Sequence, residues 1–293
     1  MRRFRPSRTA EYMAFFRALE SVRPAQDRLF HDPFAPQFVR PSLRCAIWLA
    51  KSSLFAGLVN RSTDLRLPGA RTSAIARTRL IDDALAEALK TGISQVVILG
   101  AGFDCRAYRL PQGNSTVTFE VDHPATLASK LAALGQARRE VPDRVRYVEI
   151  DFLRQTLVEV LERPNFESVR PAVFVWEGVT HYLTPEAVDS VLHFVARCAP
   201  GTRLIFTYVH SGLLDFSVSF KAAERLLRRF SQLGEPWTFG LFPERVADFL
   251  RERGLFLERD LSAEEYRLLY FGAAARRMQG YEFYHVAVAS VPQ

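Results

Sequence analysis

The sequence predicts an α/β protein built on a doubly wound, mostly parallel sheet of seven strands. From residue 95 onward, short β-branched runs alternate with helical stretches at the period of βα units. The first run, Gln95–Leu99, is almost wholly apolar and stops at Gly100 and Gly102, which is typical of a buried parallel strand that turns tightly into a helix. No long crossover helix separates the last two strands, so we expect an antiparallel edge.

The remaining elements follow from periodicity and from turn residues. Thr184 and Pro185 make a good N-cap and first helical position. The expected helices after the first strand include Pro124–Ala137, Pro185–Cys198 and Pro243–Arg253. The expected strands are Gln95–Leu99, Thr116–Val121, Val145–Ile150, Ala172–Trp176, Arg203–Tyr208, Leu255–Arg259 and Phe283–Ala289.

We expect a single domain over residues 1–293. Residues 1–70 show no strand alternation and indicate a helical extension, whereas residues 71–293 form a Rossmann-like core. Within this core, the segment at about 212–240 is amphipathic and longer than a typical connection. It predicts either a helical lid over the site or a plain packing insertion.

The apolar stretch Cys45–Val59 is short and is interrupted by Lys51. The chain contains no run of about 18 uncharged apolar residues, so no transmembrane segment is expected. The stretch indicates a core or lid helix, or else a helix that contacts a membrane interface.

Composition narrows the class of protein. The chain is 48% hydrophobic, which supplies a sizeable core, and its net charge is +7. Its arginines are spread out, without a clustered basic face, so nucleic-acid binding is not expected and the charge instead favours acidic substrates or partners. Cys45, Cys105 and Cys198 form neither a disulfide framework nor a metal-ligand spacing. We therefore expect no metal and a reducing, cytoplasmic location.

The turn after the first strand lacks the third glycine of a dinucleotide fingerprint, because Cys105 stands there. A pyrophosphate grip is therefore poorly supported. The next strand ends in Asp122, 20 residues past Gly102, where a carboxylate commonly binds ribose hydroxyls. Glycines and a ribose-binding acid without a pyrophosphate grip fit an adenosine ligand such as S-adenosylmethionine better than NAD.

Two charged residues lie where burial is costly. Arg77 is on the apolar stripe of the helix Arg71–Lys90, so it either snorkels to the surface or offers a fork to a ligand carboxylate. Glu177 directly follows an apolar strand and needs a cationic partner. That partner is either a ligand ammonium group or an arginine of the fold.

Further candidate site residues lie at the carboxyl ends of the predicted strands. Asp151 and Phe152 follow the third strand and could bind and cover an adenine, although Asp151 could instead cap the next helix. His181 and Tyr182 share the loop after the fourth strand, where His181 either contacts substrate or makes only structural hydrogen bonds. Tyr208 and His210 end the fifth strand in a similar way.

Two pairs of charged residues are expected to be structural. Asp104 and Arg106 could brace the glycine turn by pairing with each other. Asp82 and Asp83 are expected on a solvated helix face.

In these motifs the sequence resembles the leucine carboxyl methyltransferase family, including its bacterial branch of S-adenosylmethionine-dependent O-methyltransferases. The resemblance runs from about residue 10 to the C-terminus, with Cys105 in place of the family's usual threonine. The motifs are His31-Asp-Pro-Phe34, Ala76-Arg77, Leu99-Gly-Ala-Gly-Phe-Asp104, Phe119-Glu-Val-Asp-His-Pro124, Ile150-Asp-Phe152 and Glu177-Gly-Val-Thr-His-Tyr-Leu-Thr-Pro-Glu186.

The resemblance implies a class I methyltransferase fold with a helical addition over the site, and S-adenosyl-L-methionine as cofactor. By the family's pattern, Arg77 would bind the methionine carboxylate and Glu177 would approach the ammonium group. Gly100 and Gly102 would line the methionyl end, Asp122 would bind ribose, and Asp151 and Phe152 would face adenine. Eukaryotic members methylate a protein C-terminal leucine, whereas bacterial relatives include enzymes that act on carboxyl groups of polyketide-like molecules. We favour a small-molecule acceptor here over a protein C-terminus.

The expected reaction is methyl transfer to an acceptor oxygen. A carboxylate needs no general base, and Tyr182 would then only orient it; a hydroxyl would need one, and His181 is the candidate. Two other functions stay open at this point. One is a nicotinamide-dependent oxidoreductase on a similar sheet, and the other is a non-catalytic cofactor-binding scaffold.

Overall fold

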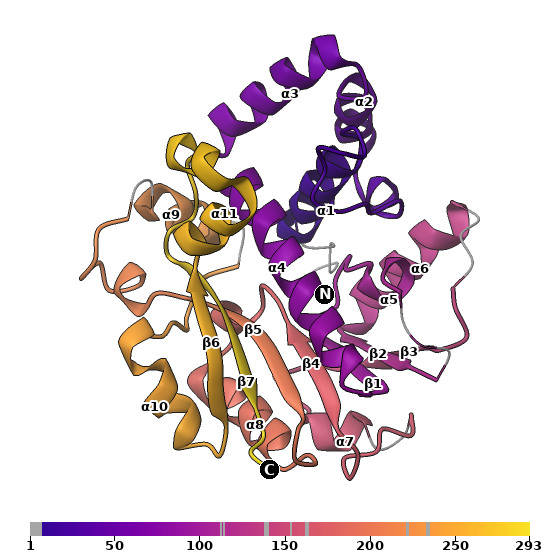
Figure 1. The fold of residues 1–293 in the computed structure, drawn as a ribbon, viewed down its shortest axis with the longest axis vertical. Helices are drawn as coiled ribbons and strands as arrows, with labels where there is room; N and C mark the ends of the chain where they lie inside the picture. The colour runs from indigo at the N-terminus through magenta and orange to yellow at the C-terminus, as the bar shows by residue number, and fades with distance from the viewer. Residues whose placement is uncertain are drawn as a thin grey trace.

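The computed structural model describes residues 8–111, 113, 115–137, 141–152, 154–161, 164–220, 223–232 and 235–293. Its centre is a seven-stranded sheet with the order β3-β2-β1-β4-β5-β7-β6 (Figure 1). The predicted seven-stranded, mostly parallel sheet is confirmed. The strands are β1 Gln95–Leu99, β2 Val117–Asp122, β3 Val145–Glu149, β4 Ala172–Trp176, β5 Arg203–Val209, β6 Phe256–Ser262 and β7 Tyr284–Ser290.

β7 runs antiparallel to both of its neighbours, β5 and β6. It lies between them, so the pairing at this edge of the sheet is antiparallel, as the sequence predicts, and β6 is the edge strand. Burial explains why β7 is the inner strand, since every β7 residue but the last is buried, whereas no residue of β6 is. β6 also carries Glu258, Arg259 and Asp260, and charged side chains suit an edge because they discourage pairing with another chain.

The helices begin close to their predicted positions in most cases. α6 and α8 start at Pro124 and Pro185, and Thr184 caps α8 by accepting a hydrogen bond from Ala187 N. The expected helix over 243–253 is divided into η4 and α10, and α11 links β6 to β7, where the sequence predicts no long helix. The helices are α1 Arg8–Ser21, η1 Ala35–Phe38, α2 Pro41–Leu49, α3 Ser53–Arg66, α4 Ala70–Lys90, α5 Arg106–Arg109, α6 Pro124–Gln136, α7 Leu157–Leu161, η2 Thr180–Tyr182, α8 Pro185–Ala196, η3 Ser211–Leu213, α9 Ala223–Gln232, η4 Pro243–Arg245, α10 Val246–Arg251, α11 Ala263–Phe271 and η5 Gly272–Arg277.

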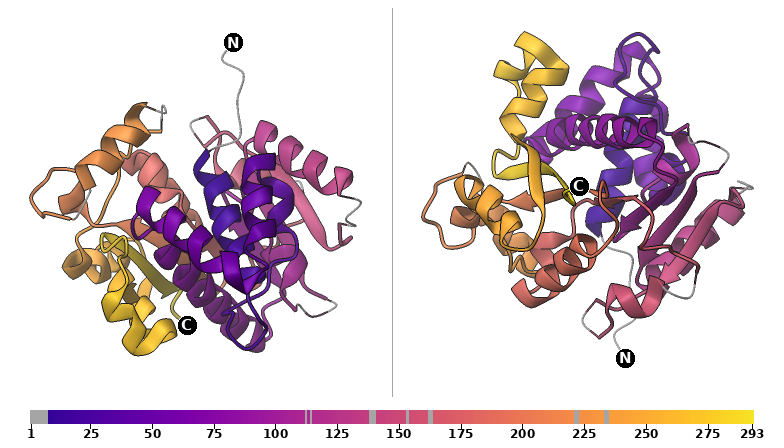
Figure 2. Two further views of the ribbon diagram at one scale, coloured as in Figure 1. Left: turned by 90° about the horizontal axis from the view of Figure 1, so that it is seen from above. Right: turned by 60° about the horizontal axis from the view of Figure 1, so that its bottom comes forward.

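Side chains point alternately to the two faces of each strand, so each strand contributes to two different cores. In β1, Val97 and Leu99 pack with residues of α7 and α8, whereas Val96 and Ile98 pack with residues of α4. In Figure 1, α4 crosses in front of the sheet and α8 lies behind it, and Figure 2 shows these layers from two further directions. Both faces of the sheet are therefore covered by helices, as a parallel sheet requires.

The helices α1, α2 and α3 lie beyond the carboxyl ends of the parallel strands (Figure 1). A third core holds α1 in place and joins Phe15 and Phe16 to Phe103 from the turn after β1. In contrast, none of the 14 residues of α3 is buried, and the structure describes all of them. Most of the apolar stretch Cys45–Val59 is therefore not a core helix.

Candidate functional site

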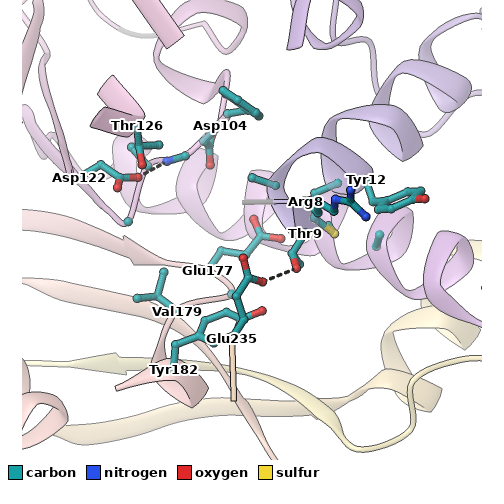
Figure 3. A pocket seen from close by; sticks show the side chains of 18 of the residues that line it. Arg8, Thr9, Tyr12, Asp104, Asp122, Thr126, Glu177, Val179, Tyr182 and Glu235 are labelled. Carbon is teal, nitrogen blue, oxygen red and sulfur yellow. Dashed lines mark hydrogen bonds between the residues drawn. The ribbon is translucent and has the colours of Figure 1, made fainter. Parts of the chain in front are cut away.

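A cavity of about 820 Å³ opens at the carboxyl ends of the parallel strands. Its walls come from the turns after β1 to β4, from α1 and α4, and from residues 235–238. Figure 3 shows Asp122 on one wall, with Glu177 and Tyr182 on another. Of the residues that the sequence predicts for the site, His181 does not line the cavity. Those that do are Arg77, Gly100, Gly102, Asp122, Asp151, Phe152, Glu177 and Tyr182.

The glycine turn after β1 is shaped by its backbone. Gly100 and Gly102 have φ angles of 62° and 44°, which favour glycine, and a Cβ at Gly100 would overlap the side chain of Val179. Gly102 N donates a hydrogen bond of 2.5 Å to Asp122 Oδ2, drawn as a dashed line in Figure 3. Burial raises the pKa of Asp122, and this bond and one from His123 N oppose the rise. The ends of β1 and β2 are thereby joined at the cavity wall.

Arg77 and Glu177 meet at the cavity although 100 residues separate them in the sequence. Arg77 Nε donates to Glu177 Oε1 at 2.8 Å, and the guanidinium lies over the ring of Tyr284. Arg77 is only 5% exposed, so the alternative that it snorkels to the surface is wrong. Its Nη1 makes no hydrogen bond to the described residues, which leaves that nitrogen for a ligand.

Glu177 has the arginine partners that the sequence leaves open as an alternative. Its Oε2 accepts a hydrogen bond of 2.7 Å from Arg106 Nη1, and its Oε1 is held by Arg77. Burial acts to raise the pKa of Glu177, but the two guanidinium groups outweigh this and lower it. Glu177 therefore stays ionised on the cavity wall, where it presents negative charge beside the positive charge of Arg77.

Arg106 is the centre of a buried ionic network. It pairs with Asp104 at 2.5 Å, which is the brace that the sequence predicts, and with Asp82 at 2.8 Å. Asp82 also accepts from Arg109 and is buried, so its placement on a solvated helix face is wrong. Burying an unpaired arginine in an apolar environment is costly, and Asp82 of the neighbouring helix α4 offsets this cost by pairing with both Arg106 and Arg109.

Asp151 and Phe152 follow β3 and line the cavity. The next helix, α7, begins at Leu157, so Asp151 is not its N-cap. The phenyl ring of Phe152 packs against the core between the sheet and α8, which fixes one wall of the cavity.

His181 lies behind the cavity wall and is 1% exposed. Its ring contacts the rings of Tyr182 and Trp237, and its Nε2 is 3.2 Å from the hydroxyl group of Tyr284. Burial and the charge of Arg77 lower the pKa of His181 to about 3. The ring is therefore neutral at pH 7 and supports Tyr284 and Tyr182 from behind, which is the structural alternative given above.

Tyr182 faces the cavity, and burial raises its pKa to about 12. Tyr208 and His210 do not line it. The hydroxyl group of Tyr208 instead donates to Asp260 at 2.6 Å, and His210 Nδ1 accepts from Gly212 N.

The sequence misses the wall residues that come from distant segments. Tyr12 and Met13 of α1 and Tyr284 of β7 line the cavity, together with Trp237. Thr9 Oγ1 donates to Glu235 Oε2 at 3.0 Å, so α1 touches the segment 235–238 across the cavity (Figure 3). The sequence does give a signal for Glu235 and Trp237, because both lie in the segment 212–240 that is expected to form a lid.

The strand order, with a reversed strand beside the edge, and the cavity at the strand ends define the class I methyltransferase fold. Two solved structures share the fold. A "duf574 family protein" from Streptomyces avermitilis has a TM-score of 0.57 at 16% identity, covering 94% of this chain and 97% of that one. A "putative methyltransferase" from Thermobifida fusca has a TM-score of 0.56 at 18% identity, covering 95% and 94%.

The profile of the leucine carboxyl methyltransferase family matches residues 10–196, so the chain belongs to this family. A relative from Mycolicibacterium gilvum is 36% identical over 210 residues, which are 71% of this chain and 67% of the relative. A second, from Mycobacterium avium, is 38% identical over 192 residues, or 63% and 61%. Each is named "Putative S-adenosyl-L-methionine-dependent methyltransferase". The protein is therefore an S-adenosylmethionine-dependent methyltransferase.

The cavity fits this cofactor in its donor set. Arg77 and Glu177 supply the opposite charges that an amino-acid zwitterion requires, with Nη1 of Arg77 unengaged by described residues. Asp122 offers carboxylate oxygens for hydroxyl groups at the end of β2.

None of the described helices has both the length and the hydropathy to traverse a lipid bilayer.

Proposed function

We propose that the protein transfers a methyl group to a carboxylate oxygen of a small, largely apolar molecule. The observation that carries this proposal is the wall of the cavity beside β4 and β7. It is aromatic and apolar, and burial raises the pKa of Tyr182 and of Tyr284, so both stay protonated at pH 7. The side chains that favour an apolar acceptor are Tyr12, Met13, Phe16, Tyr182, Trp237 and Tyr284.

The cofactor residues keep their predicted roles in this proposal. Arg77 holds a carboxylate and Glu177 an ammonium group, because their ion pair presents both charges at the wall. Asp122 accepts from ribose hydroxyls, and Asp151 and Phe152 face the adenine ring. S-adenosylmethionine, when bound, supplies an electrophilic methyl group on a sulfonium.

The reaction then needs alignment more than proton transfer. An acceptor oxygen forms a bond to the methyl carbon, the carbon–sulfur bond breaks, and its electron pair returns to sulfur, which leaves as a neutral thioether. A carboxylate with a pKa of roughly 4 is already ionised at neutral pH, so no base is required. Tyr182 donates a hydrogen bond that orients the acceptor, and Arg8 on the wall adds a positive charge for an acidic one.

His181 is a poor general base in this site. Its pKa of about 3 makes it a weak proton acceptor, and it does not reach the cavity. This disfavours a phenol or alcohol acceptor, which would need a proton removed.

We also infer that segment 212–240 acts as a lid. Leu226, Glu235 and Trp237 of this segment line the cavity, and Glu235 bonds to Thr9 on the opposite side. The helical extension and the lid would together exclude water from the reacting groups.

The test is a methyl-transfer assay with matched pairs of acceptors. Each apolar carboxylic acid is compared with the alcohol or phenol of the same skeleton, using radiolabelled S-adenosylmethionine. We expect transfer to acids, with kcat/KM flat between about pH 5.5 and 7.5 because no histidine titrates in the reaction. Preferential methylation of phenols, or a rate that rises through this pH range, contradicts the proposal.

A further inference from the structure

The helices α2 and α3 form a hairpin that exposes several large apolar side chains. Trp48 of α2 is 67% exposed, and Leu54, Leu58 and Leu65 of α3 are 81%, 64% and 74% exposed. Figure 1 shows α3 at the far end of the molecule from the amino ends of the strands. Such a surface marks an interaction site, because single domains rarely expose large side chains in groups.

The exposed leucines lie on one stripe of α3. Leu54 and Leu58 are one helical turn apart, and Leu65 follows two turns after Leu58. Arg61 lies two turns after Leu54, in line with the leucines, and Arg66 directly follows Leu65; both arginines are exposed. Exposed leucines with arginines next to them are typical of a helix that lies in the interface of a membrane.

The charge of the hairpin selects the partner. Residues 40–66 contain Arg40, Arg44, Lys51, Arg61 and Arg66, but one acid, Asp64. Asp64 is paired with Arg71 at 2.7 Å, so it does not neutralise the outer surface. A symmetric dimer through this face would bring like charges together, whereas an anionic surface complements them.

We propose that the α2–α3 hairpin docks on an anionic lipid surface, with Leu54, Leu58 and Trp48 in the apolar boundary and Arg61 and Arg66 at the headgroups. The interaction is peripheral, since the hairpin is too short and too charged to cross a bilayer. This proposal does not depend on which molecule accepts the methyl group.

The test is co-sedimentation of the full chain with vesicles of phosphatidylcholine alone or mixed with phosphatidylserine. We expect binding to the mixed vesicles, which weakens between about 0.05 and 0.5 M salt. L54S/L58S and R61Q/R66Q should each lower the partition coefficient about tenfold or more. Trp48 emission should shift to the blue on binding, and W48F should abolish that shift.

Matched controls alter exposed residues outside the hairpin. V169S/F256S removes exposed apolar side chains, R245Q/R251Q removes exposed charges, and both should bind vesicles like the wild type. Affinity for S-adenosylhomocysteine reports that each variant is folded. Absence of binding to anionic vesicles, equal binding to phosphatidylcholine alone, or a dimer in sedimentation velocity that L54S/L58S dissociates would overturn the proposal.

Discussion

At the scale of single residues, the site depends on arginines that are buried together with acids. Arg77 is paired with Glu177, and Arg106 joins Glu177 to Asp104 and Asp82. Removing one partner of such a pair leaves a buried charge without compensation, which costs more than the pair contributes. The arginine that faces the cavity therefore has two measurable roles, in ligand binding and in stability.

Arg77→Ala should weaken binding of S-adenosylhomocysteine roughly 10- to 100-fold, because charge-assisted hydrogen bonds to the carboxylate are lost. Isothermal titration calorimetry measures the change. The control is Arg79→Ala on the same helix, since Arg79 pairs with Asp83 but does not line the cavity. Equal affinities for the wild type and Arg77→Ala would remove Arg77 from the cofactor site.

His181 should make stability depend on pH. Its pKa is about 3 when folded and 6.5 in the reference state, so between these values the unfolded chain binds the extra proton and unfolding becomes easier as pH falls. Between about pH 6.5 and 4.5 this costs about 2 kcal/mol. Asp104, with a pKa of about 2, acts only below about pH 4, so it does not obscure this window.

Urea unfolding at the two pH values tests this dependence. The wild type and the exposed-histidine control His193→Asn should both lose the full amount of stability, and His181→Asn should lose much less. A drop in His181→Asn as large as in the wild type would show that His181 does not titrate in this way.

At the scale of elements, the turn after β1 fixes the distance between the cofactor site and the end of β4. Gly100 needs its positive φ angle, and it also needs to lack a Cβ because Val179 fills the space. Gly92 offers a comparison, since its φ is 90° but a Cβ there would meet nothing within 4 Å.

Gly92→Ala should cost about 1–2 kcal/mol through backbone strain alone. Gly100→Ala should cost about 1–3 kcal/mol more, because the added methyl group collides with Val179. It should also reduce affinity for S-adenosylhomocysteine. Chemical denaturation of both variants gives the difference, and equal losses would show that Val179 moves aside freely.

How far the sequence predicts each element depends on where the information lies. The ends of β1 and β4 are predicted because their apolar runs and flanking glycines are local signals. Arg77 is predicted as a site residue because a charged side chain on the apolar stripe of a helix needs a partner. The contribution of Tyr12, Trp237 and Tyr284 is not predictable, because an aromatic residue in a helix or strand signals only packing. The position of β7 between β5 and β6 is not predicted, because strand order is a long-range property, although the charges of β6 are typical of an edge strand.

At the scale of the whole molecule, the cavity joins segments from residue 8 to residue 284. A ligand that bridges α1, α4 and the ends of β1 to β4 stabilises all of them against unfolding at once. Cofactor binding should therefore be visible as a change in global stability.

At about 100 times its dissociation constant, S-adenosylhomocysteine should stabilise the fold by about 2.7 kcal/mol and raise Tm by about 5 °C. Differential scanning calorimetry measures this shift. NADH at the same concentration serves as the control and should leave Tm unchanged. An equal or larger rise with NADH would show that the cavity does not select S-adenosylhomocysteine.

The position of β7 has a consequence for synthesis on the ribosome. β5 and β6 emerge first, yet they cannot become neighbours, because the slot between them belongs to a strand that has not yet been translated. Until that strand arrives, β5 and β6 present unpaired backbone groups to other polypeptide chains nearby. The charges of β6 then serve the nascent chain as well as the finished one, since they discourage a foreign strand from entering first.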